Sequence, residues 1–398
     1  MDFRLTPEQE AAKKEYDAFF DEVIKDKPEG WLGTMEDMFA SEEGRAFHRR
    51  IAKELGKKGW LTLRWPKEYG GRGVSNIDQL IFLESVAEHG APGYDLQGIG
   101  MLAPTLMMHG SDEVKKEFLP PIAKGEVSVA QGWSEPNAGS DLASLTTKAT
   151  LDGDEFVING QKTWASGAHL CEIMYLPVRT DPNLPKHKGL SYLVLKLNEV
   201  KGITMRPLYN LAGDHFWNEV YFDDARIPRR WLVGDLNNGW HVTMSGMAHE
   251  RSGMGGFVLE CRRELTKFVQ FCKETKWEGE LLINKPDIRN KLARCAMEIQ
   301  VARSLSYRIA LLTDKGEIAM EEASTAKIYN SEMATRFNDL MINILGLYAT
   351  VAPGSKWAPF GGRYEALAQT AASWEIAGGA NEVQKNVVAR WGLGFPRL

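Results

Sequence analysis

The chain has 398 residues, of which 43% are hydrophobic and 25% charged, and its formal net charge is −5. This composition is ordinary for a globular protein, and the small negative charge gives no field that would attract nucleic acid or an anionic membrane surface. No apolar run reaches the roughly 18 residues of a membrane-spanning helix, and residues 1–7 lack the build of a signal peptide.

Residues 1 to about 122 have the periodicity of helices. Thr6, followed by Pro7 and Gln9, is a capping-box pattern with proline at the first helical position. Apolar residues then recur at helical spacing. Ser75 and Ser111 are expected to cap the N-termini of later helices.

Residues 123 to about 236 change to period two, and the chain returns to helical periodicity from residue 237. Turn signals stand at 152–154 and at Asn159-Gly160, and the Asn-Gly pair predicts a hairpin between 156–158 and a strand that contains Trp164. This order predicts a mostly α, α+β protein. Its domains would be an N-terminal α domain (1–122), a middle antiparallel β domain (123–236) and a C-terminal α domain (237–398).

Two polar segments of the β region carry the strongest functional signal. Residues 132–141 read Gly-Trp-Ser-Glu-Pro-Asn-Ala-Gly-Ser-Asp and follow a strand-like run, 127–133. Two consecutive turns there would present hydroxyls and backbone N–H groups to one side, which suits a polar, electron-poor ligand. Residues 160–167 read Gly-Gln-Lys-Thr-Trp-Ala-Ser-Gly, and on a strand the side chains of Trp164 and Ser166 would share a face.

Together these segments resemble the flavin-binding signature of the acyl-CoA dehydrogenase family. Further segments similar to that family follow in family order at 65–73, 110–120, 218–224, 378–386 and 393–397. The resemblance implies an FAD-dependent fold of three domains, the last a four-helix bundle. It also implies a homotetramer that oxidises an acyl-CoA to its α,β-enoyl form in fatty acid or carboxylic acid degradation. An electron-transferring flavoprotein would be the acceptor.

The resemblance also assigns site residues. Backbone groups near Ser134 and its hydroxyl should meet the flavin ring, Trp164 should back the ring, and Ser166 should offer a hydroxyl near N5. The residues assigned to FAD are Gln131, Trp133, Ser134, Trp164, Ser166 and Glu382. Ser140 and Arg251 are assigned to the acyl-CoA substrate.

Desaturation needs a carboxylate to accept the α-proton, and the position of this base departs from the most familiar family pattern. Many members carry it as the glutamate of a Tyr-Glu-Gly-Thr segment, where this chain has Gly378. A second family solution places a glutamate before an arginine on the first long C-terminal helix, which matches Glu250-Arg251. Glu250 is therefore the predicted base. The alternatives are Glu375, Glu382, or a chain without a base for this step.

The glycines around Glu250 support that choice. Gly246 and Gly253 stand four residues before and three residues after it, on the same helical face. Each costs the helix about 0.8–1.0 kcal/mol relative to alanine, so space for a ligand beside the carboxylate is the expected compensation. This space, with the missing C-terminal glutamate, suggests a branched, cyclic or otherwise bulky acyl group.

Several departures and alternatives stay open. Members often grip the FAD pyrophosphate with an Arg-x-x-Phe-Gly segment, but residues 275–279 here read Thr-Lys-Trp-Glu-Gly, so Lys276 is a candidate replacement. The histidines predict no metal site, and His215 is interpreted as a turn residue. The four cysteines lie far apart, and we expect reduced thiols and a cytoplasmic protein. The alternative functions are a catalytically silent acyl-CoA- or FAD-binding subunit of a hetero-oligomer, and a flavin oxidase or monooxygenase on the same scaffold.

Overall fold

The structure is a computed structural model that describes residues 4–34, 37–253, 256–351 and 354–396, with only the backbone described at 40, 248–253 and 256–257. It divides into two compact units. The first contains Lys27–Val74 and Pro92–Gly253, and the second contains Met1–Asp26, Ser75–Ala91 and Met254–Leu398. Among the described helices, none is both long enough and apolar enough to cross a membrane.

The first unit is built on a mixed sheet. Its strands are β1 (Val129–Gln131), β2 (Lys148–Asp152), β3 (Glu155–Lys162), β4 (Ile173–Arg179), β5 (Leu190–Lys196), β6 (Ile203–Tyr209), β7 (His215–Pro228) and β8 (Leu232–Val233). They follow the order β6-β7-β3-β2-β4-β5-β8, with β1 beside β4. The predicted antiparallel pairing is confirmed for most neighbours, although β1 and β2 each pair with β4 in parallel.

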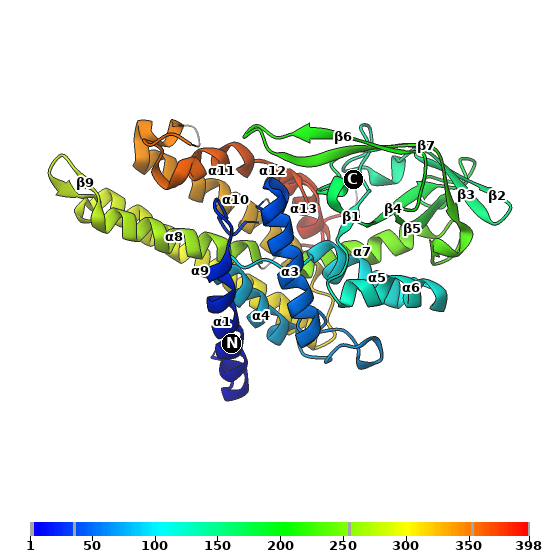
Figure 1. Ribbon diagram of the computed structural model, residues 1–398, viewed down its shortest axis with the longest axis horizontal. Helices are drawn as coiled ribbons and strands as arrows, with labels where there is room; N and C mark the ends of the chain where they lie inside the picture. Colours follow the sequence, from blue (N-terminus) through cyan, green and yellow to red (C-terminus); the bar gives the residue numbers. More distant parts are fainter. Residues whose placement is uncertain (1–3, 35–36, 254–255, 352–353, 397–398) are drawn as a thin grey trace. The chain divides into compact units, whose positions relative to one another are not determined.

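Helices accompany this sheet. They are α2 (Asp37–Ala40), α3 (Glu42–Lys58), the π-helical segment η3 (Leu96–Leu102), α5 (Ala103–His109), α6 (Asp112–Ala123) and α7 (Gly239–Gly253). Helix α7 packs against β5 and β4, and Figure 1 shows α5, α6 and α7 on one side of the sheet. Ser111 caps α6 by accepting a hydrogen bond from the Val114 N–H, as predicted.

The hairpin predicted at Asn159-Gly160 is wrong. Strand β3 runs through this pair to Lys162, with only a bulge between Ile158 and Gly160, and the tight connection lies instead between β2 and β3. The cause is a partner on β7. The Asn159 side chain donates to Asp224 and accepts from the Asp224 N–H, both at 2.9 Å, so Asn159 is held in the sheet.

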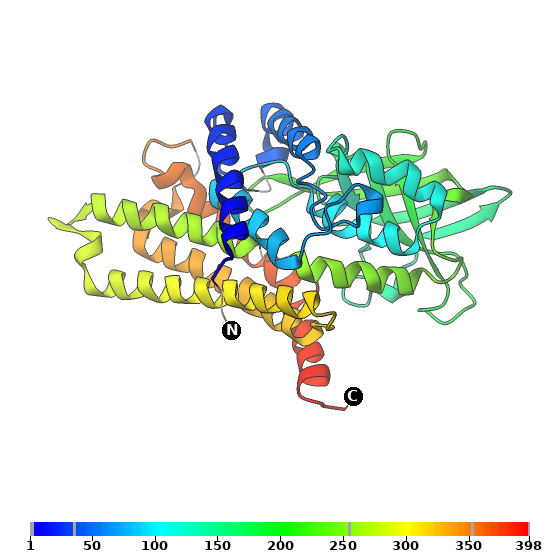
Figure 2. The same cartoon turned by 90° about the horizontal axis from the view of Figure 1, so that it is seen from below.

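The second unit is helical. It contains α1 (Pro7–Val23), α4 (Asn76–His89), α8 (Gly256–Glu274), α9 (Pro286–Asp314), α10 (Met320–Leu345), α11 (Arg363–Ala371), α12 (Ser373–Ile376) and α13 (Asn381–Val387). The predicted C-terminal bundle is formed by α8, α9, α10 and α11 around buried side chains such as Phe268, Phe337 and Tyr364. Figure 2 shows α8, α9 and α10 running side by side. The predicted capping box at Thr6 and the predicted N-cap at Ser75 are confirmed, and Ser75 forms a capping box as well.

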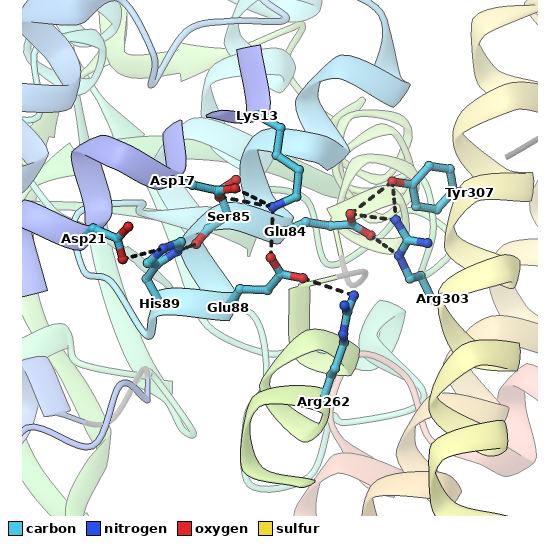
Figure 3. Close-up of polar contacts among 10 residues, drawn as sticks. All are labelled: Lys13, Asp17, Asp21, Glu84, Ser85, Glu88, His89, Arg262, Arg303 and Tyr307. Atoms are coloured by element: carbon cyan, nitrogen blue, oxygen red, sulfur yellow. Dashed lines mark hydrogen bonds and ion pairs between the residues drawn. The ribbon is translucent and has the colours of Figure 1, made fainter. Parts of the chain in front are cut away.

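Charged side chains join α4 to the bundle of this unit (Figure 3). The Glu84 carboxylate, which is 1% exposed, accepts two hydrogen bonds from the Arg303 guanidinium, at 2.5 and 2.9 Å. The Tyr307 hydroxyl donates to the same carboxylate at 3.0 Å. Around it, Glu88 forms ion pairs with Lys13 on α1 and with Arg262 on α8, at 2.9 and 3.1 Å. Helix α4 thus carries a buried ion pair at Glu84 and, one turn later, more exposed ion pairs at Glu88.

The four cysteines are free and buried, so the expected thiols are confirmed. Burial raises the pKa of the Cys272 thiol to about 11 and that of the Cys295 thiol to about 12. Groups with such pKa values stay protonated at neutral pH, and we infer that they serve packing rather than catalysis.

Candidate active site

The predicted turn after β1 is present in the first unit and is fixed by a buried carboxylate. Glu135 and Ala138 exchange two backbone hydrogen bonds of 3.0 Å, which closes the turn. The Glu135 carboxylate accepts hydrogen bonds from the backbone N–H groups of Thr146 and Thr147 and from the Lys162 ammonium group. Burial alone would raise the pKa of Glu135, but the Lys162 charge and these hydrogen bonds outweigh it and lower the pKa to about 2. The turn is therefore anchored by a permanent anion.

Several hydrogen-bond donors at the start of this turn, residues 131–134, have no acceptor in the part of the chain that the structure describes, and we call this region the open corner. The Gln131 side-chain amide and the Trp133 indole N–H are buried without a hydrogen-bond partner among the described residues. Within the same ranges, no acceptor is found for the backbone N–H groups of Trp133 and Ser134. Buried donors are nearly always satisfied in folded proteins, so a cluster of open ones indicates a ligand that carries acceptors.

Trp164 lies beyond the end of β3, which stops at Lys162. Its backbone is in the left-handed region, with φ at 59°, and its side chain is 58% exposed. The expectation that Trp164 and Ser166 share the face of a regular strand is therefore wrong. A bulky residue in this conformation costs about 1–3 kcal/mol and is typical of binding sites. An exposed indole on a strained backbone favours a flat ligand as its partner.

The conformation of Trp164 is held by Asn218 on β7, which is 1% exposed. Asn218 exchanges backbone hydrogen bonds with Ala165, and its side-chain amide donates to the Ala165 carbonyl at 3.0 Å and to His169 Nδ1 at 3.0 Å. His215 Nε2 lies 2.9 Å from the Asn218 oxygen, and its ring stacks on that of His169 at 3.9 Å. His215 begins β7, so its interpretation as a turn residue is wrong.

This histidine pair predicts a pH dependence. Burial and the neighbouring His215 lower the pKa of His169 from 6.5 to about 4. Because the folded state takes up the proton less readily than the unfolded chain, folding stability is full above pH 6.5 and falls as the pH drops toward about 4. Urea unfolding across this range should show a smaller acid loss for His169→Gln than for the wild type. His187→Gln, which changes an exposed histidine, should behave as the wild type; equal acid losses in all three proteins would contradict the prediction.

Helix α7 carries the predicted base. A β-carbon added at the buried Gly246 would lie 3.5 Å from the Trp133 ring and 3.4 Å from the Thr105 hydroxyl, so this face of the helix points to the open corner. Glu250 follows one turn later on the same face of the continuous helix. The side chains of Glu250 and Arg251 lie outside the described residues. The helix thus supports the predicted placement through its backbone.

The alternative bases belong to the second unit. The Glu375 carboxylate accepts a hydrogen bond of 2.9 Å from the Thr335 hydroxyl on α10, and its carbonyl accepts one from Lys327. Glu382 is exposed in the first turn of α13. Gly378, at the position of the familiar family base, has φ at 65°. Both the side chain and the backbone carbonyl of Glu375 are thus bound by residues of α10.

The remaining predicted residues lie on exposed segments. Ser140 is exposed beside Asp141, whose carboxylate pairs with Lys186 at 2.9 Å. Lys276 is exposed on β9 (Lys276–Trp277), which pairs with β10 (Glu280–Leu281) through a turn where Glu278 and Gly279 both have positive φ. In the first unit the Thr163 N–H donates to the Ser134 carbonyl, which joins the segment of Trp133 and Ser134 to the one that leads to Trp164. Sequence reasoning missed two buried residues of these segments, Lys162 and Asn218.

Comparison with known proteins identifies the class. Acyl-CoA dehydrogenase family models match the chain with the N-terminal domain at residues 6–126, the middle domain at 130–225 and the C-terminal domain at 237–393. The acyl-CoA dehydrogenase FadE26 of Mycobacterium tuberculosis is 34% identical over 100% of this chain and 99% of its own length. The solved structure titled Tcur3481-Tcur3483 steroid ACAD is 32% identical, with full coverage of both chains and a TM-score of 0.90. The ChsE4-ChsE5 complex from Mycobacterium tuberculosis is 34% identical, also with full coverage, and has a TM-score of 0.86.

The fold and these similarities define a flavin-dependent dehydrogenase. The chain belongs to the acyl-CoA dehydrogenase family, and it is an FAD-dependent oxidoreductase that acts on acyl-CoA. The open donors at Gln131, Trp133 and Ser134, with the exposed Trp164 indole, fit an isoalloxazine, which is flat and carries several acceptors. Neither the silent subunit nor the oxidase is favoured by these similarities.

Trp164→Ala is expected to weaken FAD retention more than alanine at any other tryptophan. The change removes the exposed indole that we expect to back the flavin ring, while alanine, which also has a β-carbon, keeps the strain of the left-handed backbone. The ratio of flavin absorbance to protein absorbance after gel filtration measures the loss. Trp357→Ala, at an exposed tryptophan of the second unit, is the control. Equal FAD retention in both variants would contradict a role for Trp164 in holding the flavin.

Proposed function

We propose that this chain desaturates a bulky acyl-CoA thioester between its α- and β-carbons, with Glu250 as the base. The observation that carries the proposal is the corner of open donors at Trp133 and Ser134, faced by Gly246 one turn before Glu250. A carboxylate on that face of α7 would be close to a substrate that lies against the same corner, which supports the proposal. Glu250 accepts the α-proton, which general-base catalysis of this step requires.

The other assigned residues bind and orient. Gln131, Trp133 and Ser134 donate hydrogen bonds to FAD, Trp164 backs its ring, and Ser166 and Glu382 complete the set. FAD, when bound, supplies the acceptor for the hydride that leaves the β-carbon. Ser140 and Arg251 hold the CoA thioester, so that its α-carbon lies near Glu250. Fixing the thioester in this way converts proton removal into a step between pre-positioned groups.

The acyl group is proposed to be branched, cyclic or otherwise bulky. The absence of the familiar C-terminal glutamate, whose position holds Gly378, supports this. The similar structure titled a steroid ACAD supports a polycyclic acyl group in particular.

Anaerobic bleaching of the flavin by a panel of straight, branched and cyclic acyl-CoA thioesters tests both parts of this proposal. Bleaching should be fastest with the bulky thioesters. Purified protein that is colourless and cannot be reconstituted with FAD would overturn the whole assignment. A preference for short straight chains would overturn only the acyl group.

An electron-transferring flavoprotein is the proposed acceptor, and degradation of a carboxylic acid is the proposed setting. Reduced enzyme with bound enoyl product should reoxidise slowly in air and quickly with such a flavoprotein or an artificial one-electron acceptor. Fast stoichiometric formation of hydrogen peroxide would indicate an oxidase instead.

A homotetramer is the proposed assembly. Large apolar side chains are exposed on the second unit, among them Met297 and Val301, one turn apart on α9, and Trp357, Trp391 and Phe395. Exposed apolar side chains in such number favour protein contacts. Native mass spectrometry of the chain expressed alone should give a tetramer with bound FAD. A smaller species without FAD would favour assembly with a second chain, as in the ChsE4-ChsE5 complex.

We also propose the division into domains at 1–122, 123–236 and 237–398, which lies close to the ranges matched by the family models. Lys276 is proposed to replace the arginine that contacts the FAD pyrophosphate. A cytoplasmic location is favoured by four buried free thiols, because a reducing compartment keeps such groups unpaired.

A further inference from the structure

Lys162, the last residue of β3, is a lysine with no exposed surface. Lysine is almost never fully buried unless it is paired, and here the partner is Glu135, whose Oε1 lies 2.9 Å from the Lys162 ammonium nitrogen. The same nitrogen donates to the Trp133 carbonyl at 3.2 Å. Burial lowers the pKa of Lys162 to about 8 despite the Glu135 charge, so the group remains mostly protonated at neutral pH.

The bond to the Trp133 carbonyl fixes a whole peptide group. In a trans peptide the C=O of one residue and the N–H of the next point in opposite directions, and the described chain contains no cis peptide. Because Lys162 holds the Trp133 carbonyl, the Ser134 N–H must point away from Lys162. That N–H is one of the donors without an acceptor among the described residues.

The neighbouring peptide is fixed in the same manner. The Thr163 N–H donates to the Ser134 carbonyl at 2.9 Å, so two consecutive carbonyls of the turn are held by two consecutive residues of the β3 end. Glu135 meanwhile is held by Thr146 and Thr147 as well as by Lys162, so it stays in place without the lysine. Glu135 therefore anchors the turn through several donors, whereas Lys162 contacts the turn backbone at the Trp133 carbonyl.

We propose that Lys162 is a positioning residue for the flavin: its ammonium group holds the Trp133 carbonyl and thereby aims the Ser134 N–H at the cofactor. The proposal rests on the proposed role of Ser134 in binding FAD. Lys162 itself does not contact the flavin in this arrangement. It acts through the peptide between Trp133 and Ser134.

Lys162→Met tests the proposal, because methionine keeps the length of the buried chain and removes the donor. The dissociation constant of FAD, measured by titration of apoprotein, should rise about tenfold or more, as expected when one well-aimed hydrogen bond is lost. Ile158→Ala is the matched control, since Ile158 is equally buried on the same strand and its strand neighbours are Ala149 and Ala225. It should leave FAD affinity within about twofold of the wild type while lowering stability through its cavity.

Glu135→Gln separates positioning from simple loss of the ion pair. Glutamine removes the negative charge but keeps a side-chain oxygen that can accept the hydrogen bond from Lys162, so Lys162 stays on the Trp133 carbonyl and FAD affinity should stay within about threefold of the wild type. If Glu135→Gln weakens FAD binding as much as Lys162→Met does, the lysine is merely half of a structural pair and the proposal is overturned. Wild-type affinity in Lys162→Met overturns it equally.

Hydrogen–deuterium exchange on the wild type keeps the test decisive if Lys162→Met does not fold. The Ser134 amide should exchange freely in apoprotein and become protected when FAD is added. Unchanged exchange at Ser134 on FAD binding would overturn the proposal, whatever the variants do. Failure of the wild type to bind FAD at all would instead contradict the proposed function, so the two failures are distinguishable.

Discussion

Glu250→Gln should slow flavin reduction by a good acyl-CoA substrate by about 10²–10⁴-fold, the usual cost of losing a general base. Glutamine keeps the size and hydrogen-bonding capacity of the side chain but cannot accept the α-proton. FAD content and acyl-CoA affinity should stay near the wild type, because neither depends on the Glu250 charge in this mechanism. Single-turnover stopped-flow absorbance, recorded anaerobically, measures the rate of flavin bleaching directly.

Glu375→Gln and Glu382→Gln are the matched controls, and each should cost much less. A near wild-type rate in Glu250→Gln together with a slow rate in Glu375→Gln would move the base to the C-terminal segment. Placing glutamate at position 378 in the Glu250→Gln background should restore part of the activity. The rescue should be incomplete, since Gly378 has φ at 65° and a side chain there costs about 1–3 kcal/mol of backbone strain.

Glu84→Gln is expected to lower the free energy of unfolding by about 3 kcal/mol, because it breaks a buried ion pair of the second unit. The substitution leaves the Arg303 guanidinium without its counter-charge, and that side chain is only 21% exposed. The partial exposure places the expected cost at the lower end of the range for a broken buried pair. Urea unfolding at saturating FAD is the measurement, so that both proteins carry the same ligand contribution.

Glu88→Gln provides the contrast on the same helix (Figure 3). Its partners Lys13 and Arg262 are 23% and 53% exposed, so the loss should stay within about 1 kcal/mol, as for surface ion pairs. Replacing both Glu84 and Arg303, as Glu84→Leu with Arg303→Met, should recover much of the stability lost in Glu84→Gln. Equal costs for Glu84→Gln and Glu88→Gln would show that burial does not govern this network.

Features set by neighbouring residues could be predicted from the sequence. The caps at Thr6, Ser75 and Ser111 depend on a side chain and a backbone N–H three residues away, and all three are present. The helix that carries Glu250 and the helical bundle follow from periodicity in the same way. Such local signals do not need the rest of the fold.

Features set by distant partners could not be predicted. Asn159-Gly160 has the composition of a hairpin turn, but Asp224, 65 positions away, holds Asn159 in the sheet. The left-handed backbone of Trp164 depends on Asn218, which bonds Ala165 from another strand. Lys162 stands in an ordinary strand sequence, and its partners in the folded protein are the Trp133 carbonyl and the Glu135 carboxylate, 29 and 27 positions away. In the sequence, Lys162 follows Phe156 and Ile158 at the spacing of one strand face, and this position is the feature that could have indicated a buried lysine.

The interleaved make-up of the two units has a consequence for synthesis on the ribosome. The first unit ends at Gly253, so all of it can emerge and fold while translation continues. The second unit contains α1 and α4 from the start of the chain, yet Arg303, the partner of Glu84, is translated 219 residues after it. In the nascent chain α1 and α4 can pack on each other, but the face of α4 that contacts α8 and α9 has no partner from its own unit until those helices are made. Chaperones that shield exposed helices should bind stalled chains ending just after residue 253 and release the complete protein.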